Sequence, residues 1–151
     1  MELFRKLILA CLLCLLVEEQ APCMPSAPTI NAQISVMVGG GRKPVILGST
    51  NLPDGLEAVM TVYHGRRLMA EERVVIEEGN FQAGPFSDGG NPYPAGIYTM
   101  SLESEISQLQ PEKVQAVIGH NGELLRGPLV GKHSLFHFER IVRLQLTVII
   151  Q

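Results

Sequence analysis

Four histidines are the side chains of this sequence best suited to metal binding or acid–base chemistry. They are His64, His120, His133 and His137. His133 and His137 are four positions apart and would share one face of a helix, but the surrounding residues favour the start of a β-strand. Four residues of strand span about 13 Å, which is too far for two ligands of one zinc ion. With no cysteine nearby and no third ligand evident, we expect no metal site.

Other patterns that suggest catalysis or ligand binding are incomplete. Ser87 and Asp88 could be combined with a histidine into a hydrolase triad, but the sequence has no G-x-S-x-G motif. The run Gly39–Lys43 lacks the spacing of a phosphate-binding loop, and a proline follows it where a helix would have to begin. Asp88 and Asn91 supply one carboxylate, whereas calcium needs about six to eight oxygen ligands. We therefore expect neither an enzyme nor a cofactor.

One loop, residues 84–96, carries the side chains that we expect to contact a partner. It is rich in glycine and proline, and the candidates are Phe86, Asp88, Asn91 and Tyr93. Rigid loops with exposed aromatic side chains at the end of a β-sandwich are common contact surfaces. The alternative is that the two aromatic rings cover the hydrophobic core. Replacement of Tyr93 by alanine separates these hypotheses, because only the loss of a core residue would lower the melting temperature.

Short β-strands must position these residues, because apolar side chains recur at every second position from Ile34 onward. Turns follow at intervals of about 8–12 residues, a spacing typical of β-sandwiches. The clearest turn is at residues 51–55, where a proline, an aspartate and a glycine favour a chain reversal. Residues 73–77 and 81–86 should form a hairpin. The other expected strands are residues 33–38, 45–48, 56–63, 96–104, 124–125 and 142–150.

One helix-like segment, residues 110–119, lies among the strands. Pro111 suits the first turn of a helix, Glu112 its positive end and Gly119 its C-terminal cap. The chain shows no regular alternation of strands and helices, so a parallel α/β sheet is not expected. The predicted fold class is all-β, an antiparallel β-sandwich of seven or eight strands with one short helix.

The N-terminal segment has the pattern of an export signal. Arg5 and Lys6 precede an apolar run, Leu7–Val17, which suits a signal peptide and is too short to span a bilayer. The alternatives are a retained anchor or a buried amphipathic helix. We expect a signal peptide at residues 1–23, a linker at 24–31 and a β-sandwich domain at 32–151. The protein should then be exported, to the periplasm or outside the cell.

Composition argues against several classes of partner. The net charge is −3, and the 12 basic and 15 acidic residues are interspersed, so there is no basic stripe for nucleic acid. Tryptophan is absent, which disfavours platforms that stack bases or sugars. All three cysteines lie at or before position 23, so the domain must be stabilised by its core alone. A lipid attached to Cys11 or Cys23 is a less favoured alternative.

The stretch VILGSTNLPDG at residues 45–55 resembles the strand, turn and strand of bacterial immunoglobulin-like domains in exported proteins. Asn80-Phe81, Gly84–Ser87 and Pro94–Tyr98 are similar to later parts of such domains. The resemblance covers roughly residues 32–104 and implies an immunoglobulin-like antiparallel β-sandwich, here preceded by an N-terminal signal helix. It implies no active site, because the shared motifs encode turns and a common sandwich leaves the function open.

These features predict an exported, non-enzymatic domain that contacts another protein or belongs to an envelope assembly. The alternative is a periplasmic small-ligand or chaperone-like binding protein that uses the cavity between the sheets. The run Val142–Ile150 could pair with a second copy if it lies at a sheet edge. Membrane contact is expected only through the N-terminal segment, if that segment is not cleaved.

Overall fold

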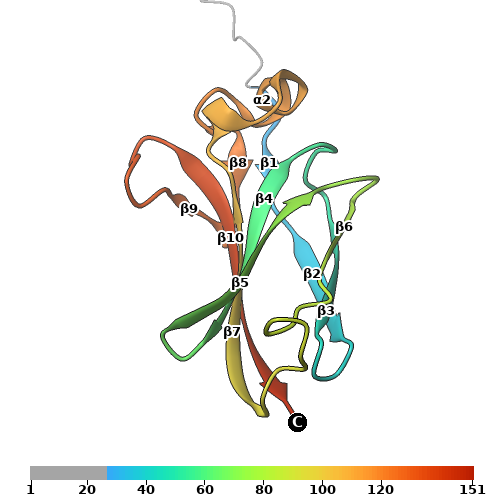
Figure 1. Cartoon of the computed structure of the whole chain (residues 1–151). Helices are drawn as coiled ribbons and strands as arrows, with labels where there is room; N and C mark the ends of the chain where they lie inside the picture. The colour runs from blue at the N-terminus through green and yellow to red at the C-terminus, as the bar shows by residue number, and fades with distance from the viewer. Residues whose placement is uncertain (1–26) are drawn as a thin grey trace, which may run out of the picture.

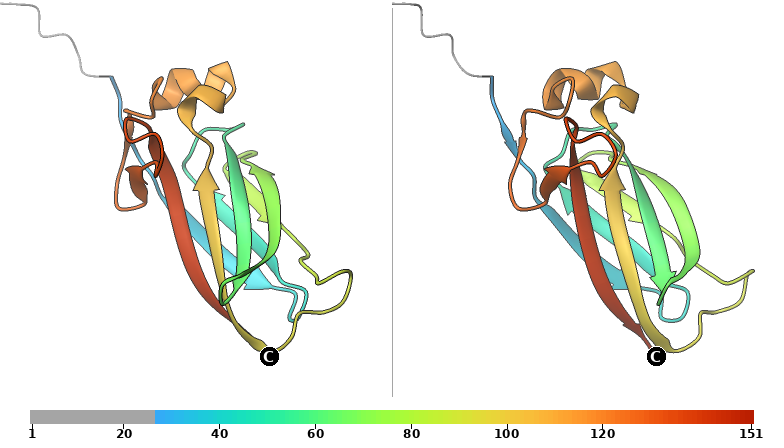
Figure 2. Two further views of the ribbon diagram at one scale, coloured as in Figure 1. Left: turned by 60° about the vertical axis from the view of Figure 1, so that its left-hand side comes forward. Right: turned by 90° about the vertical axis from the view of Figure 1, so that its left-hand side faces the viewer.

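The computed structural model describes residues 27–151, which form a β-rich domain with one short α-helix (Figure 1). The predicted signal peptide at residues 1–23 and the first part of the predicted linker lie outside the described residues. Two antiparallel sheets face each other, as Figure 2 shows, in an arrangement consistent with a β-sandwich. Within the described part of the chain, no helix is both long enough and apolar enough to cross a membrane.

The larger sheet has five strands in the order β5-β4-β7-β10-β9. Along the chain these are β4 (Glu57–His64), β5 (Arg67–Val75), β7 (Gly96–Ser104), β9 (Val130–Lys132) and β10 (Arg140–Ile150). β7 lies at the centre and pairs with β4 on one side and β10 on the other. β9 is three residues long, so it covers only the first part of β10.

The smaller sheet has three strands in the order β2-β3-β6, namely β2 (Ile34–Gly39), β3 (Val45–Thr50) and β6 (Asn80–Ala83). The predicted loop Gly39–Lys43 joins β2 to β3, and the N–H of Lys43 donates to the carbonyl of Gly40 at 3.0 Å. Because β6 contacts β5, β2 at the other end of this sheet lies on the side of β10.

The core is built from the alternating apolar positions that the sequence predicted. The expected inward side chains of residues 56–62 and 98–102 are all buried: Leu56, Ala58, Met60, Val62, Tyr98, Met100 and Leu102. Burial of a leucine, valine or methionine side chain contributes about 1.5–3 kcal/mol. In the smaller sheet, Gly48 leaves room for the Phe81 ring of the neighbouring strand, because a Cβ at this position would collide with the ring.

The helices cover one end of the sandwich (Figure 1). The helix predicted at residues 110–119 is confirmed as α2 (Glu112–Ile118), and the 3-10 helix η2 (Ser107–Leu109) precedes it. Val114 and Ile118 lie one turn apart and are buried, so they fix α2 to the core. Gly119 ends the helix with a φ of 91°, which glycine adopts without strain. A further pair of short strands, β1 (Ile30–Asn31) and β8 (Leu125–Arg126), runs parallel beside this end.

The predicted hairpin between residues 73–77 and 81–86 was wrong. β5 begins earlier, at Arg67, and pairs with β4, whereas β6 pairs with β3 of the other sheet. Glu78 and Gly79 both have positive φ and turn the chain from one sheet to the other. A turn signal in the sequence is local, so it does not show whether the next strand joins the same sheet or the opposite one.

Candidate interaction surface

The residues expected to contact a partner are divided between the core and the surface. Phe86 and Tyr93 lie in the loop that joins β6 to β7, and their side chains are buried, with 5% and 0% exposed. The N–H of Phe86 donates to the carbonyl of Pro44 at 2.9 Å, and that of Tyr93 to the carbonyl of Arg42 at 2.7 Å. The two rings therefore cover the core, as the alternative hypothesis had it, and offer no exposed aromatic surface.

Asp88 and Asn91 lie at the tip of the same loop. Their backbones exchange two hydrogen bonds, of 3.0 and 3.1 Å, across two glycines with positive φ. The Asp88 carboxylate lies 3.6 Å from the guanidinium of Arg67, in a solvated ion pair that contributes little to stability. These two polar residues are the accessible part of the predicted contact site, and their contact with a partner stays a prediction.

Stacked aromatic rings pack beneath the loop that joins β6 to β7. The Tyr98 ring stacks on His64 and on Tyr93, with centroid distances of 4.5 and 5.2 Å. The Tyr98 hydroxyl donates to the carbonyl of Pro94 at 2.9 Å, whereas the buried Tyr93 hydroxyl has no partner among residues 27–151. Burial is the main cause that raises the pKa of both phenols. Both are therefore neutral at pH 7 and unsuited to act as nucleophiles.

The two histidines with metal-like spacing lie in a loop. The sequence predicted His133 and His137 at the start of a strand, but β10 begins only at Arg140. The Nδ1 atom of His133 instead accepts the N–H groups of Leu135 and Phe136, at 3.3 and 3.1 Å. Across residues 27–151, no three His, Cys, Asp or Glu side chains gather closely enough to hold a metal ion.

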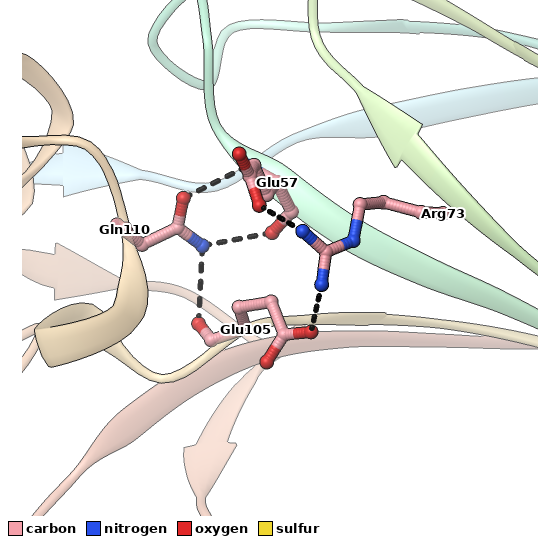
Figure 3. A network of polar contacts seen from close by, with 4 residues as sticks. All are labelled: Glu57, Arg73, Glu105 and Gln110. Atoms are coloured by element: carbon pink, nitrogen blue, oxygen red, sulfur yellow. Dashed lines mark hydrogen bonds and ion pairs between the residues drawn. The ribbon is translucent and has the colours of Figure 1, made fainter.

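A polar network not predicted from the sequence fixes the helices to the larger sheet (Figure 3). The side-chain oxygen of Gln110 accepts the N–H of Glu57 at 2.8 Å. Its amide nitrogen donates to the carbonyls of Glu57 and Glu105, at 2.8 and 3.2 Å. Arg73 lies 3.0 Å from the Glu57 carboxylate and 3.8 Å from that of Glu105. Gln110 and Glu57 are 53 positions apart, so no local signal could have revealed this structural contact.

The feature best suited to bind another chain is the outer edge of β10. β9 pairs only with Arg140–Val142. Over residues 144–150, β10 has β7 on one side, and no strand of the described chain pairs with it on the other. The run Val142–Ile150 was expected to pair with a second copy if it lies at a sheet edge, and most of this run does lie there.

The direction of the backbone groups on this edge follows from one hydrogen bond. The N–H of Arg143 donates to the carbonyl of Leu129 at 2.8 Å, on the side away from β7. Because successive residues of a strand point their backbone groups to opposite sides, Gln145, Thr147 and Ile149 direct theirs the same way. Each of these three residues therefore presents an N–H donor and a C=O acceptor at the free edge.

The inner face beside this edge is only partly covered. Leu144, Leu146 and Val148 are half-buried and pack against the core. On β2, which lies on the same side in the smaller sheet, Ile34 and Val36 are half-buried as well. Natural edge strands often carry charged residues or prolines that prevent pairing with another chain, but residues 144–150 contain neither. This side of the sandwich therefore combines unpaired backbone groups with incompletely covered apolar side chains.

Comparisons of the chain with protein-family models, with curated proteins and with solved structures give no match. The resemblance to bacterial immunoglobulin-like domains therefore stays a prediction.

Proposed function

We propose that this chain is an exported, non-enzymatic domain with an immunoglobulin-like β-sandwich fold that assembles with a second copy of itself in the cell envelope. The observation that carries the proposal is the unpaired outer edge of β10 at residues 144–150. Such edges recruit further strands because their backbone donors and acceptors lack partners. The second copy adds its own β10 in the antiparallel direction and continues the sheet.

An antiparallel pairing centred on Thr147 is self-complementary. A two-fold axis places Thr147 opposite its symmetry mate and Gln145 opposite Ile149. All three residues direct their backbone groups outward, so each can exchange two hydrogen bonds with the residue opposite. The same patch serves both copies, and assembly closes at a dimer.

The side chains of β10 are compatible with this pairing. Residues 144–150 contain no charged side chain, so the axis brings no like charges together. On the inner face, the second strand covers apolar surface of Leu144, Leu146 and Val148 that is exposed in the single copy. Removal of such surface from water contributes about 25 cal/mol per Å², which favours the dimer.

One feature of the sequence supports export, and a second is compatible with it. The apolar run Leu7–Val17 follows Arg5 and Lys6, as in a signal peptide. The residues that follow position 23 contain no cysteine, so the domain can fold in an oxidising or a reducing compartment. The two sheets and the turn at residues 51–55 support the immunoglobulin-like assignment.

Replacement of Thr147 by proline tests the dimer. Proline lacks the N–H that donates across the proposed interface, and the sheet of the single copy does not use that group. The matched control Thr147→Ala removes the same side chain but keeps the N–H. In size-exclusion chromatography with light scattering, the wild-type full chain and Thr147→Ala should be dimers, and Thr147→Pro a monomer.

Two results would contradict the proposal: a wild-type chain that stays monomeric at high concentration, or a Thr147→Pro chain that remains as dimeric as Thr147→Ala. Circular dichroism shows whether the proline variant is folded. If it is not, Thr147→Lys replaces it, because a lysine at the two-fold axis places two like charges together and leaves the backbone unchanged.

A further inference from the structure

The loop between β9 and β10 exposes three large apolar side chains. Leu135, Phe136 and Phe138 are 78%, 44% and 63% exposed, and the two phenyl rings lie 6.2 Å apart between centroids. Single exposed apolar residues are common on proteins, but a contiguous cluster at the tip of a loop indicates a contact site. The proposed dimer does not use this loop, so its exposure calls for a separate explanation.

Local contacts hold the loop in this conformation. The ring of His133 stacks on Phe136 with a centroid distance of 5.3 Å, and its Nδ1 atom accepts two backbone N–H groups of the loop. The N–H of His133 donates to the carbonyl of Glu139 at 3.0 Å, and the N–H of Glu139 donates to the carbonyl of Phe136 at 2.8 Å. Because the Glu139 side chain is fully buried, the loop is anchored at its base and its tip is preorganised for binding.

A cationic hollow lies directly beside the loop. It has a volume of about 210 Å³, and Arg126, Lys132 and Arg140 line it without any acidic residue. Among residues 27–151, no carboxylate lies within 4.0 Å of these three cations. The two arginines donate to the carbonyl of Leu125, at 2.8 and 3.4 Å, which orients them without neutralising their charge. Such a site suits a phosphate group.

The hollow and the aromatic tip lie at one corner of the molecule. Lys132 ends β9 and Arg140 begins β10, so two of the cations flank the loop on both sides. β1 pairs with β8, with Ile30 opposite Leu125, and therefore brings the start of the described chain to the hollow. Figures 1 and 2 show β1, β8 and the loop toward the end that carries the helices, away from the C-terminus.

We propose that this corner binds the surface of a bilayer that contains anionic phospholipids. Phe136 and Phe138 enter the boundary between headgroups and acyl chains, and Arg126, Lys132 and Arg140 contact lipid phosphates. A bilayer fits better than a protein, because the apolar residues form an exposed tip beside a hollow that is lined by three cations. The described part of the chain also begins at this corner, directly after the predicted N-terminal segment. This contact extends the sequence-based expectation, which limited membrane binding to that segment.

The absence of tryptophan from the chain allows a direct test. Phe138→Trp in the full chain places the only indole at the tip of the loop. With vesicles of phosphatidylglycerol and phosphatidylcholine, its emission should shift to shorter wavelength and become protected from aqueous acrylamide. Vesicles of phosphatidylcholine alone should give a smaller shift. Addition of Lys132→Gln should weaken binding to the anionic vesicles about fivefold, since one cation near such a surface contributes about 1 kcal/mol.

Matched controls use the hairpin between β4 and β5, which lies toward the opposite end of the domain in Figure 1. Leu68 is also exposed, so Leu68→Trp should show no shift with the same vesicles, even if the N-terminal segment holds the chain on them. Arg66→Gln should leave the response of Phe138→Trp unchanged.

Three results would overturn the proposal: no shift of the indole emission of Phe138→Trp with anionic vesicles, an equal shift from Leu68→Trp, or an equal shift with phosphatidylcholine alone. The first of these would point to a protein partner for the loop. Thermal unfolding checks that the variants are folded, and Phe136→Trp provides a second reporter in the same cluster. None of these outcomes depends on the oligomeric state tested with Thr147→Pro.

Discussion

Replacement of Tyr93 by alanine shows most directly whether the loop at residues 84–95 covers the core or presents its aromatic ring to a partner. The Tyr93 side chain has no exposed surface and stacks on Tyr98 at 5.2 Å. If the ring supports the core, Tyr93→Ala must lower the free energy of unfolding. If the loop functions mainly by presenting this ring to a partner, the variant should lose binding and keep its stability.

The expected magnitude follows from burial and from the unpaired hydroxyl. Removal of a buried aromatic side chain costs about 3–5 kcal/mol. The Tyr93 hydroxyl has no hydrogen-bond partner within residues 27–151, so its removal by itself raises the free energy of unfolding by about 1 kcal/mol. The net loss is about 2–4 kcal/mol, which lowers the melting temperature of a domain of this size by about 6–20 °C.

Two conservative variants separate the ring from the hydroxyl. Tyr93→Phe keeps the ring and removes the unpaired group, so it should be neutral or stabilising by up to about 1 kcal/mol. Tyr98→Phe removes the hydroxyl that donates to Pro94 and should cost about 1 kcal/mol. Melting followed by circular dichroism measures all three variants against the wild type. An unchanged melting temperature in Tyr93→Ala, or a larger loss in Tyr93→Phe than in Tyr98→Phe, would refute the reasoning.

Two further predictions concern polar groups. Gln110→Ala leaves backbone groups of Glu57 without their partner and should cost about 2–3 kcal/mol in urea unfolding; an equal effect from the exposed Gln108→Ala would contradict this. The Asn121 N–H is the main cause that lowers the pKa of Glu123. The ionised carboxylate therefore stabilises the fold above its ordinary pKa, and this stability is lost as pH falls through the lowered value. Glu123→Gln should reduce the loss of stability between pH 7 and about pH 3; an unchanged loss would contradict it.

The sequence determined those elements that depend on local patterns. The strands at residues 56–63 and 96–104 follow from alternation of apolar side chains, and the structure buries their predicted inward positions. The helix at residues 110–119 follows from a proline at its start and a glycine at its end. Each signal lies within about ten residues, so it can be recognised without knowledge of the rest of the fold.

Tertiary structure alone decided which strand has a free edge and which aromatic rings are exposed. β10 reads as a strand in the sequence, but its free edge arises because β9 stops after three residues. Tyr93 and Phe138 both lie in loops between strands, yet the first is fully buried and the second is 63% exposed. Tyr93 is held by Arg42, a residue 51 positions away. Burial and pairing depend on such distant contacts, and no local pattern of residues contains them.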